Sequence, residues 1–149
     1  HIVQRGQVID DFSPVRIWIF GPSPHSAKRQ QDFNQASLAL QVRYGKSALF
    51  FAGDTEIEGE QDLIGYGDLL RSDILQAGHH GSKTSSSQAF LEQVRPRYAI
   101  LSLGAFNRFG HPAHQVTRRL SALGSDTLRT DLTGAVTFSS DAYTIIRKK

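Results

Sequence analysis

Residues 73–87, DILQAGHHGSKTSSS, combine a short apolar stretch, a loop with two adjacent histidines and a run of serines. The apolar stretch Asp73 to Ala77 predicts a buried strand. Ser85 with Gln88 three residues later is a capping box, which predicts a helix over Ala89 to Val94. A strand followed by a loop and a helix is the unit from which α/β layered domains are built.

The chain on both sides of this stretch repeats the alternation of strands and helices. Strands are expected over Val15 to Phe20, Ser37 to Arg43, Ser47 to Ala52, Tyr98 to Leu103, Thr127 to Thr130, Ala135 to Ser139 and Tyr143 to Arg147. Helices are expected from about Glu56 to Ile64, with a capping box of Thr55 and Glu58, and from Pro112 to Leu123. Tyr44-Gly45-Lys46 predicts a hairpin turn, and Ser23 to Phe33 predicts a loop. The pattern predicts one α/β layered domain.

The composition is that of an ordinary globular chain, with 39% hydrophobic and 21% charged residues. A length of 149 residues is enough for one domain or a large part of one. The net charge of +3 and the pI near 9.5 are compatible with a polyanionic partner, although small proteins often carry this much charge. The absence of cysteine excludes disulfides and thiolate metal sites, so any metal must be held by His, Asp or Glu.

The sequence has no candidate membrane span. Its longest apolar run, Ala48 to Ala52, is far shorter than the roughly 20 residues that a spanning helix needs. No signal-peptide pattern opens the chain, which contains no Met and starts at His1. We therefore expect this sequence to be a piece of a longer protein.

Polar side chains that suit a metal centre follow three of the expected strands. They are Asp54, the adjacent pair His79 and His80, and His111. Strand ends in α/β folds are where ligands and catalytic groups gather, and a carboxylate with imidazoles there suits zinc or manganese. Taken singly, each has a simpler explanation, since Asp54 could be a turn residue and a lone His is more often a satisfied loop residue.

Several short motifs stand in a characteristic order between residues 34 and 138. They are Ser37 to Leu40, Phe50 to Glu56, Asp73 to Ser87, Phe90-Leu91, Val94-Arg95-Pro96, Ser102-Leu103-Gly104, Asn107-Arg108-Phe109-Gly110-His111-Pro112, Arg129-Thr130-Asp131 and Gly134-Ala135-Val136. In order and spacing they resemble the C-terminal half of the metallo-β-lactamase-like domain in ComEC-type DNA-uptake (late competence) proteins.

This resemblance implies an αββα sandwich, of which residues 1–149 would form the C-terminal half as a single partial domain. It also implies a two-metal hydrolase site at the edge of the sheets, with Asp54 bridging the metals and one of the two adjacent histidines binding one of them. Strand alternation favours His79 as that metal ligand, because it shares parity with the apolar residues of the preceding strand. His80 and His111 are then the candidate catalytic residues.

Candidate phosphate contacts lie in two loops. Ser82, Lys83 and Ser85 lead into a helix N-terminus, which is a natural anion site. The alternative there is helix capping alone, which would explain Ser85 but not the whole run. Asn107 and Arg108 could hold a phosphate or a leaving group, and the alternative is a turn held by side-chain hydrogen bonds.

The chain lacks one motif of the family it resembles. Metallo-β-lactamase-like enzymes take most metal ligands from a His-x-His-x-Asp-His loop in the first half of the domain, and this sequence has no such loop. Two metals need about seven or eight protein ligands, at three to four per metal. We therefore expect two divalent metals, zinc or manganese, in the intact domain only. The chain alone is expected to bind metal weakly or not at all and to have negligible hydrolase activity.

The resemblance implies phosphodiester hydrolysis by the intact parent, with single-stranded DNA as substrate. It also implies a parent in the inner membrane, with this domain as a soluble extracytoplasmic part beside the membrane-embedded channel portion of the same chain. Two alternatives stay open: a non-catalytic DNA-handling or assembly module with an incomplete metal site, and a hydrolase of small or cell-wall phosphoesters. A half-domain exposes surface that its partner half should cover, so a homodimer of the chain would be unsurprising.

Overall fold

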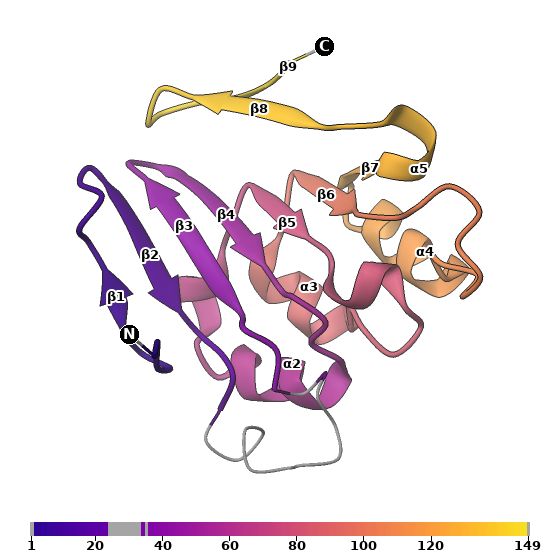
Figure 1. Ribbon diagram of the computed structural model, residues 1–149, viewed down its shortest axis with the longest axis horizontal. Helices are drawn as coiled ribbons and strands as arrows, with labels where there is room; N and C mark the ends of the chain where they lie inside the picture. Colours follow the sequence, from indigo (N-terminus) through magenta and orange to yellow (C-terminus); the bar gives the residue numbers. More distant parts are fainter. Residues whose placement is uncertain (1, 24–33, 35, 149) are drawn as a thin grey trace.

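The computed structural model describes residues 2–23, 34 and 36–148 and is built around a seven-stranded mixed sheet (Figure 1). The strands lie side by side in chain order as β1 Val8–Ile9, β2 Val15–Ile19, β3 Leu40–Tyr44, β4 Ser47–Phe51, β5 Ile74–Gln76, β6 Tyr98–Leu101 and β7 Asp126–Arg129. Pairs from β1 to β4 are antiparallel, and pairs from β4 to β7 are parallel. The parallel half needs crossover connections, which helices supply.

The hairpin expected at Tyr44-Gly45-Lys46 joins β3 to β4. Tyr44 pairs with Ser47, which leaves Gly45 and Lys46 as the two turn residues. Gly45 has a φ of +57°, and a Cβ added there would lie 2.5 Å from the carbonyl oxygen of Ala142. Only glycine fits this turn without displacing its neighbour.

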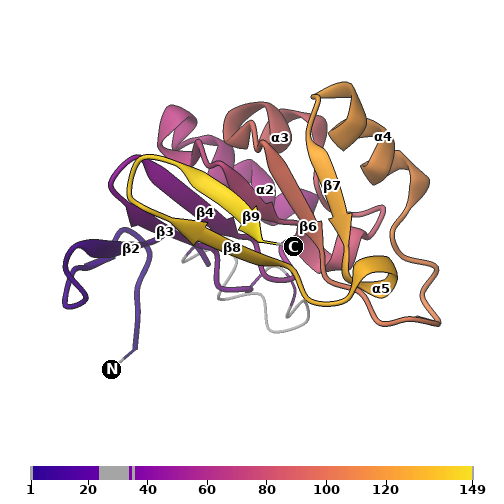
Figure 2. The ribbon, with the colours of Figure 1, turned by 90° about the horizontal axis from the view of Figure 1, so that it is seen from above.

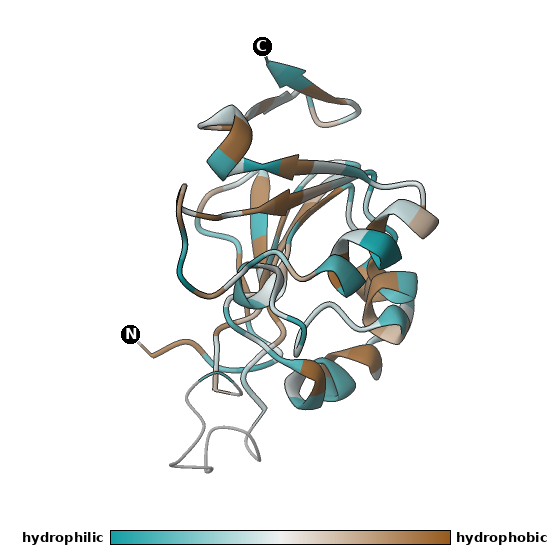
Figure 3. Ribbon diagram, turned by 90° about the vertical axis from the view of Figure 1, so that its right-hand side faces the viewer, coloured by the Kyte–Doolittle hydropathy of each residue, from teal (hydrophilic) through white to brown (hydrophobic). Residues whose placement is uncertain are grey.

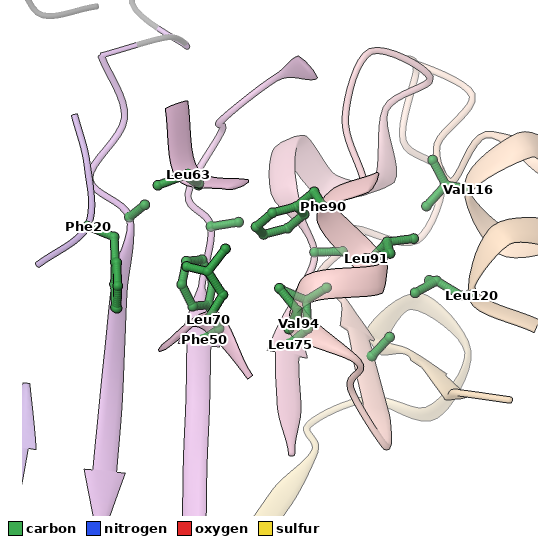
Figure 4. Close-up of a cluster of buried hydrophobic side chains, with 14 of the residues drawn as sticks. Phe20, Phe50, Leu63, Leu70, Leu75, Phe90, Leu91, Val94, Val116 and Leu120 are labelled. Atoms are coloured by element: carbon green, nitrogen blue, oxygen red, sulfur yellow. The ribbon is translucent and has the colours of Figure 1, made fainter. Parts of the chain in front are cut away.

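Three helices cover one face of the sheet: α2 (Ile57–Ile64), α3 (Gln88–Val94) and α4 (His114–Ala122) (Figure 2). Alternate strand residues such as Phe50 and Leu75 point toward these helices and are fully buried (Figure 4). The ring centroids of Phe50 and Phe90 lie 5.7 Å apart, which links β4 to α3. Figure 3 shows hydrophobic segments in the central strands, while each helix carries both hydrophobic and hydrophilic residues. The main core therefore lies between sheet and helices.

A two-stranded hairpin, β8 (Thr137–Ser140) and β9 (Ile145–Lys148), lies against the other face (Figure 2). The ring of Phe138 lies 5.1 Å from that of Tyr98 at the start of β6, and the hydroxyls of Ser140 and Ser47 are 2.7 Å apart. The hairpin thus crosses the amino ends of the parallel strands. The sheet lies between a helical layer and this hairpin, and the predicted α/β layered fold is confirmed.

Two helices start differently from what the sequence predicts. The N-cap of α2 is Glu56, and no side chain caps the helix, so the expected capping box at Thr55 is wrong. The N-cap of α4 is Ala113, so Pro112 precedes the helix instead of occupying its first turn. The Ala113 N–H bonds the carbonyl of Gly81, and this tertiary contact sets where the helix can begin.

The start of α3 is also displaced, and a second helix contributes to its cap. Ser87, and not Ser85, is the N-cap, and its hydroxyl accepts a helix N–H. The Glu60 carboxylate of α2 accepts the backbone N–H groups of Ser86 and Ser87. Glu60 is fully buried, and burial raises the pKa of its carboxyl, against the opposing effects of these hydrogen bonds and of the Arg119 charge. The expected capping box at Ser85 is therefore wrong, and the cap combines the Ser87 hydroxyl with the Glu60 carboxylate of another helix.

Some short elements carry too few residues for a sequence pattern to reveal them. They are β1, two 3₁₀ turns, η1 (Gly67–Leu70) and η2 (Gly78–Gly81), and the single-turn helix α5 (Thr130–Thr133). The expected loop over Ser23 to Phe33 falls almost entirely outside the described residues. Across the part of the chain that the structure describes, no helix combines the length and the apolarity needed to cross a membrane.

Candidate functional site

The carboxyl ends of β4, β5 and β6 bring the predicted site residues together. Asp54 follows β4, His79 and His80 follow β5, and His111 lies in the loop after β6. The His79 ring lies 6.4 Å from that of His80 and 5.8 Å from that of His111, measured between centroids. The Nε2 atom of His80 lies 3.7 Å from Oδ1 of Asp54. Parallel strands place their carboxyl ends at one edge of a sheet, and this edge holds the candidate site.

The backbone at the histidine pair has an uncommon conformation. His79 has φ and ψ of 45° and 44°, and His80 has 54° and 25°, so both lie in the left-handed region. Two close contacts hold this turn: the His79 N–H bonds the carbonyl of Gly53, and the Ser82 N–H bonds the carbonyl of His79. A Cβ at the preceding Gly78 would come within 2.6 Å of the Thr55 carbonyl oxygen, so glycine is required there. The strain is held in place by packing around it.

Glu56 is a site residue that the sequence analysis did not identify. Its Oε1 atom lies 2.8 Å from Nδ1 of His79 and accepts hydrogen bonds from the Thr84 hydroxyl at 2.9 Å and the Asn34 amide at 3.4 Å. By bonding Nδ1, this carboxylate orients the His79 ring so that its Nε2 atom points away from Glu56. The available signal was position, because Glu56 stands two residues after Asp54 at the end of the same strand.

His80 is held by a backbone carbonyl from the segment that follows β6. Its Nδ1 atom lies 2.8 Å from the carbonyl oxygen of Ser102, and since a carbonyl only accepts, this nitrogen carries the proton. Its Nε2 atom faces Asp54. Strand alternation does not reach the two histidines, because β5 ends at Gln76 and both lie within the turn η2. The structure places the His80 ring next to the Asp54 carboxylate.

His111 is the third imidazole at this edge, and its loop is tied by Asn107. The Asn107 amide donates to the His111 carbonyl and accepts the His111 N–H, each at 2.9 Å. The ring of Phe109 stacks on His111 at 5.9 Å with an interplanar angle of 18°. Burial, and then the nearby His79 and His80, lower the pKa of His111, which favours its neutral form.

The predicted phosphate contacts divide into exposed and structural residues. Lys83 and Arg108 are exposed at the candidate edge. Ser85 is fully buried, and its hydroxyl donates to the carbonyls of Gly78 and Ser82, so it supports the loop instead of facing a ligand. The Ser82 hydroxyl is nearly buried and pairs with Thr84, and the Asn107 amide is used within its own loop, as the turn alternative expects.

The donor set fits part of a divalent-metal site and does not complete one. Asp54, His79 and His80 offer the oxygen and imidazole donors that zinc and manganese bind. Among residues 2–23, 34 and 36–148, however, no three acidic or imidazole side chains are placed to hold one ion. The described residues therefore bring fewer than three such ligands to any single metal.

Comparison with known proteins links this arrangement to one superfamily. A sequence model of the Metallo-beta-lactamase superfamily matches residues 10–105. The fold resembles the crystal structure of a protein from Parabacteroides distasonis whose assignment as a metal-dependent hydrolase is itself provisional, with a TM-score of 0.54 at 16% identity. That match covers 87% of this chain and 57% of the other and supports the fold alone.

Three curated proteins are similar to this chain in sequence. The chain is 46% identical to Competence protein ComA of Neisseria gonorrhoeae over 114 residues, which is 76% of this chain and 16% of that protein. It is 34% identical to ComE operon protein 3 of Bacillus subtilis over 137 residues, 91% of this chain and 17% of that protein. Recombination protein 2 of Haemophilus influenzae is 40% identical over 114 residues, 76% of this chain and 14% of that protein. The chain thus spans about one sixth of the length of these relatives.

Proposed function

Because the chain belongs to the metallo-beta-lactamase superfamily and is similar to competence proteins, we propose that it supplies part of a phosphodiester-hydrolase site in a DNA-uptake protein. The proposed substrate is single-stranded DNA. The proposed parent lies in the inner membrane, with this domain on the extracytoplasmic side next to the membrane-embedded channel portion of the same chain.

The observation that carries the proposal is the strained histidine pair. A left-handed conformation costs a non-glycine residue about 1 kcal/mol or more, and such residues cluster at functional sites. Here two consecutive histidines adopt it at the strand edge that also holds Asp54 and His111. A structural turn alone would be served better by glycine or asparagine at these two positions.

The side chains suggest a division of roles. Asp54 and His79 would hold the divalent metal, with Glu56 fixing the His79 ring as carboxylates commonly do for metal-binding histidines. His80 is the other candidate ligand because its open Nε2 faces Asp54. A divalent metal, when bound, polarises a phosphoryl oxygen as a Lewis acid.

The remaining residues would handle protons and charge. His111, whose lowered pKa favours the neutral imidazole, is suited to accept a proton, and His80 is suited to move one at Nε2 when it does not bind metal. Lys83 and Arg108 are exposed at the same edge and would neutralise the charge of a phosphodiester. Ser82, Ser85 and Asn107 would act by shaping the two loops.

A non-catalytic DNA-handling module is the second candidate, and the incomplete ligand set favours it. In that case the edge would retain its shape without turnover. The first candidate predicts DNA hydrolysis by the full-length natural protein, and the second predicts DNA binding without hydrolysis. A hydrolase of small or cell-wall phosphoesters would differ from both in its substrate.

The test is hydrolysis by the full-length natural protein with manganese or zinc. Fluorescent single-stranded DNA and bis(4-nitrophenyl) phosphate would be compared as substrates, with Asp54→Asn as the inactive variant and His114→Gln, an exposed residue of α4, as the control. We expect turnover of DNA that Asp54→Asn lowers by at least about 100-fold. DNA binding without turnover would support the module, and cleavage of the small diester alone would support the small-substrate hydrolase.

Metal binding by the 149-residue chain itself is tested by calorimetric titration with zinc and manganese. We expect weak or no binding, because fewer than three of the described ligands reach one ion. A submicromolar dissociation constant would contradict this expectation.

A further inference from the structure

A basic groove lies at the amino ends of the parallel strands, opposite the candidate site. It consists of two adjoining pockets of about 530 and 450 Å³ that share Arg43 and Gly45. We define the basic groove by six cationic residues that line the two pockets: Arg16, Arg43, Lys46, Arg71, Arg95 and Arg97. They come from β2, from β3 and its turn, and from the segments that lead into β5 and β6.

Among the described residues, no ion pair compensates the positive charge of this groove. Three acidic residues, Asp10, Asp68 and Asp73, also line the pockets, which leaves an excess of basic groups. Within the described ranges, none of the six cations lies within ion-pair distance of a carboxylate. The Asp73 carboxylate instead accepts the backbone N–H of Ala48 at 2.9 Å.

Strand register places two of these charges side by side. Arg16 on β2 is paired directly with Arg43 on β3, so both side chains lie on the same face of the sheet. The Arg43 guanidinium donates to the side-chain oxygen of Gln41 and, at 2.8 Å, to the carbonyl of Leu69. These neutral acceptors hold the group in place and leave its charge unbalanced. Like charges directly opposite each other destabilise a sheet, so an anionic ligand would relieve a cost present in the free protein.

One aromatic ring accompanies the cations of the groove. The guanidinium of Arg43 lies 5.7 Å from the Trp18 ring. Trp18 itself lines the second pocket. Basic grooves that contain aromatic rings are typical of proteins that bind single-stranded nucleic acid, since phosphates meet the cations and bases stack on the rings.

We propose that the basic groove binds the phosphodiester backbone of single-stranded nucleic acid, as a second site separate from the candidate active site. The strands between the two edges have up to five residues, so the sites lie about 17 Å apart at a rise of about 3.3 Å per residue. A strand held here would be kept near the domain without occupying the histidine edge. The cations line a hollow that also contains the Trp18 ring, which suits a nucleic acid strand better than a flat anionic membrane surface.

The test measures binding without turnover, so its result does not depend on the proposed hydrolysis. Fluorescein-labelled dT20 would be titrated with the 149-residue chain in EDTA at 50 and 200 mM NaCl and followed by anisotropy. Arg71→Glu and Arg97→Glu, made singly, are expected to weaken binding about 5- to 10-fold and to flatten the salt dependence by about 0.7 or more in log–log slope. Arg118→Glu, an equal charge change at an exposed position on α4, is the matched control and is expected to change affinity less than 2-fold.

Each other outcome overturns the proposal. Absence of dT20 binding at 50 mM NaCl does so, as does an equal loss in the groove variants and in Arg118→Glu. Binding to vesicles of 30% phosphatidylglycerol in phosphatidylcholine that the groove variants abolish, without dT20 binding, would assign the groove to a membrane surface. Arg71→Gln and Arg97→Gln serve as milder variants, and circular dichroism melting checks that every variant is folded.

Discussion

The two ends of the parallel strands differ in how their polar side chains are paired. At the carboxyl edge, polar side chains are paired with one another: His79 with Glu56, His80 with the Ser102 carbonyl and Asp54. At the amino edge, the cations of the basic groove have no carboxylate partner among the described residues. The carboxyl edge holds imidazole rings in fixed orientations, and the amino edge concentrates positive charge.

This difference separates two physical tasks. Chemistry at a reacting atom depends on direction, so the carboxyl edge uses short hydrogen bonds and a strained backbone to fix its groups. Holding a polyanion depends on net potential, which many loosely placed cations supply together. We therefore expect single substitutions to have large, local effects at the carboxyl edge and small, additive effects at the amino edge.

The largest expected effect is on stability and concerns Glu60, the buried carboxylate that caps α3. Glu60→Ala removes the acceptor of the Ser86 and Ser87 N–H groups and leaves a cavity, so the free energy of unfolding should fall by about 3 kcal/mol. Urea denaturation measures this loss. Gln61→Ala, the exposed neighbour on α2, is the control and should change stability by less than about 0.5 kcal/mol.

The next effect concerns Glu56 and turnover. Glu56→Ala in the full-length natural protein should lower hydrolysis about 10- to 100-fold, because the His79 ring loses the carboxylate that orients it. Glu56→Gln keeps an oxygen acceptor and should recover part of the activity. Equal activity in wild type and Glu56→Ala would show that His79 needs no carboxylate partner. It would contradict the view that the carboxyl edge depends on fixed side-chain orientations.

A smaller effect is the pH dependence that Glu60 adds to the stability of the fold. Since burial raises the pKa of Glu60 in the folded state, the folded protein binds the proton more tightly than the unfolded chain does. The contribution of this proton to the free energy of unfolding is fully present below the pKa of the unfolded chain, near 4.5. It is lost as pH rises through the higher pKa of the folded state. Chemical denaturation from pH 4 to 8 should show this decline in wild type and a flatter profile in Glu60→Gln. A steeper decline in the variant would contradict the assignment.

The smallest effect has the opposite sign and belongs to the amino edge. Arg16→Gln removes one of two opposed guanidinium groups and should raise the free energy of unfolding by about 0.5 kcal/mol at low salt. The gain should disappear at 1 M NaCl, where charges are screened within about 3 Å. A destabilised Arg16→Gln at low salt would mean that the Arg16–Arg43 pair is not repulsive.

Most of the fold was predictable because it rests on local patterns. Alternating apolar residues gave the hairpin of β3 and β4, and the apolar stretch around Leu75 gave an interior strand. The helix starts were less predictable, since the caps of α3 and α4 involve Glu60 and Gly81 from other elements. The grouping of the candidate site residues was predicted, while their pairing was not. Glu56 was missed, and the strand alternation that favoured His79 as the metal ligand does not extend into the turn Gly78–Gly81, which holds both histidines.

The sequence by itself determined the α/β class and the gathering of Asp54, the two histidines and His111 at one edge, because strand periodicity and strand order follow from residue spacing. The same motifs indicated the family that the comparisons support. Only the tertiary structure decided which carboxylate meets which imidazole, because that depends on the left-handed turn after β5. It alone also brought six cations from distant segments into one groove, since their clustering follows from strand register and packing.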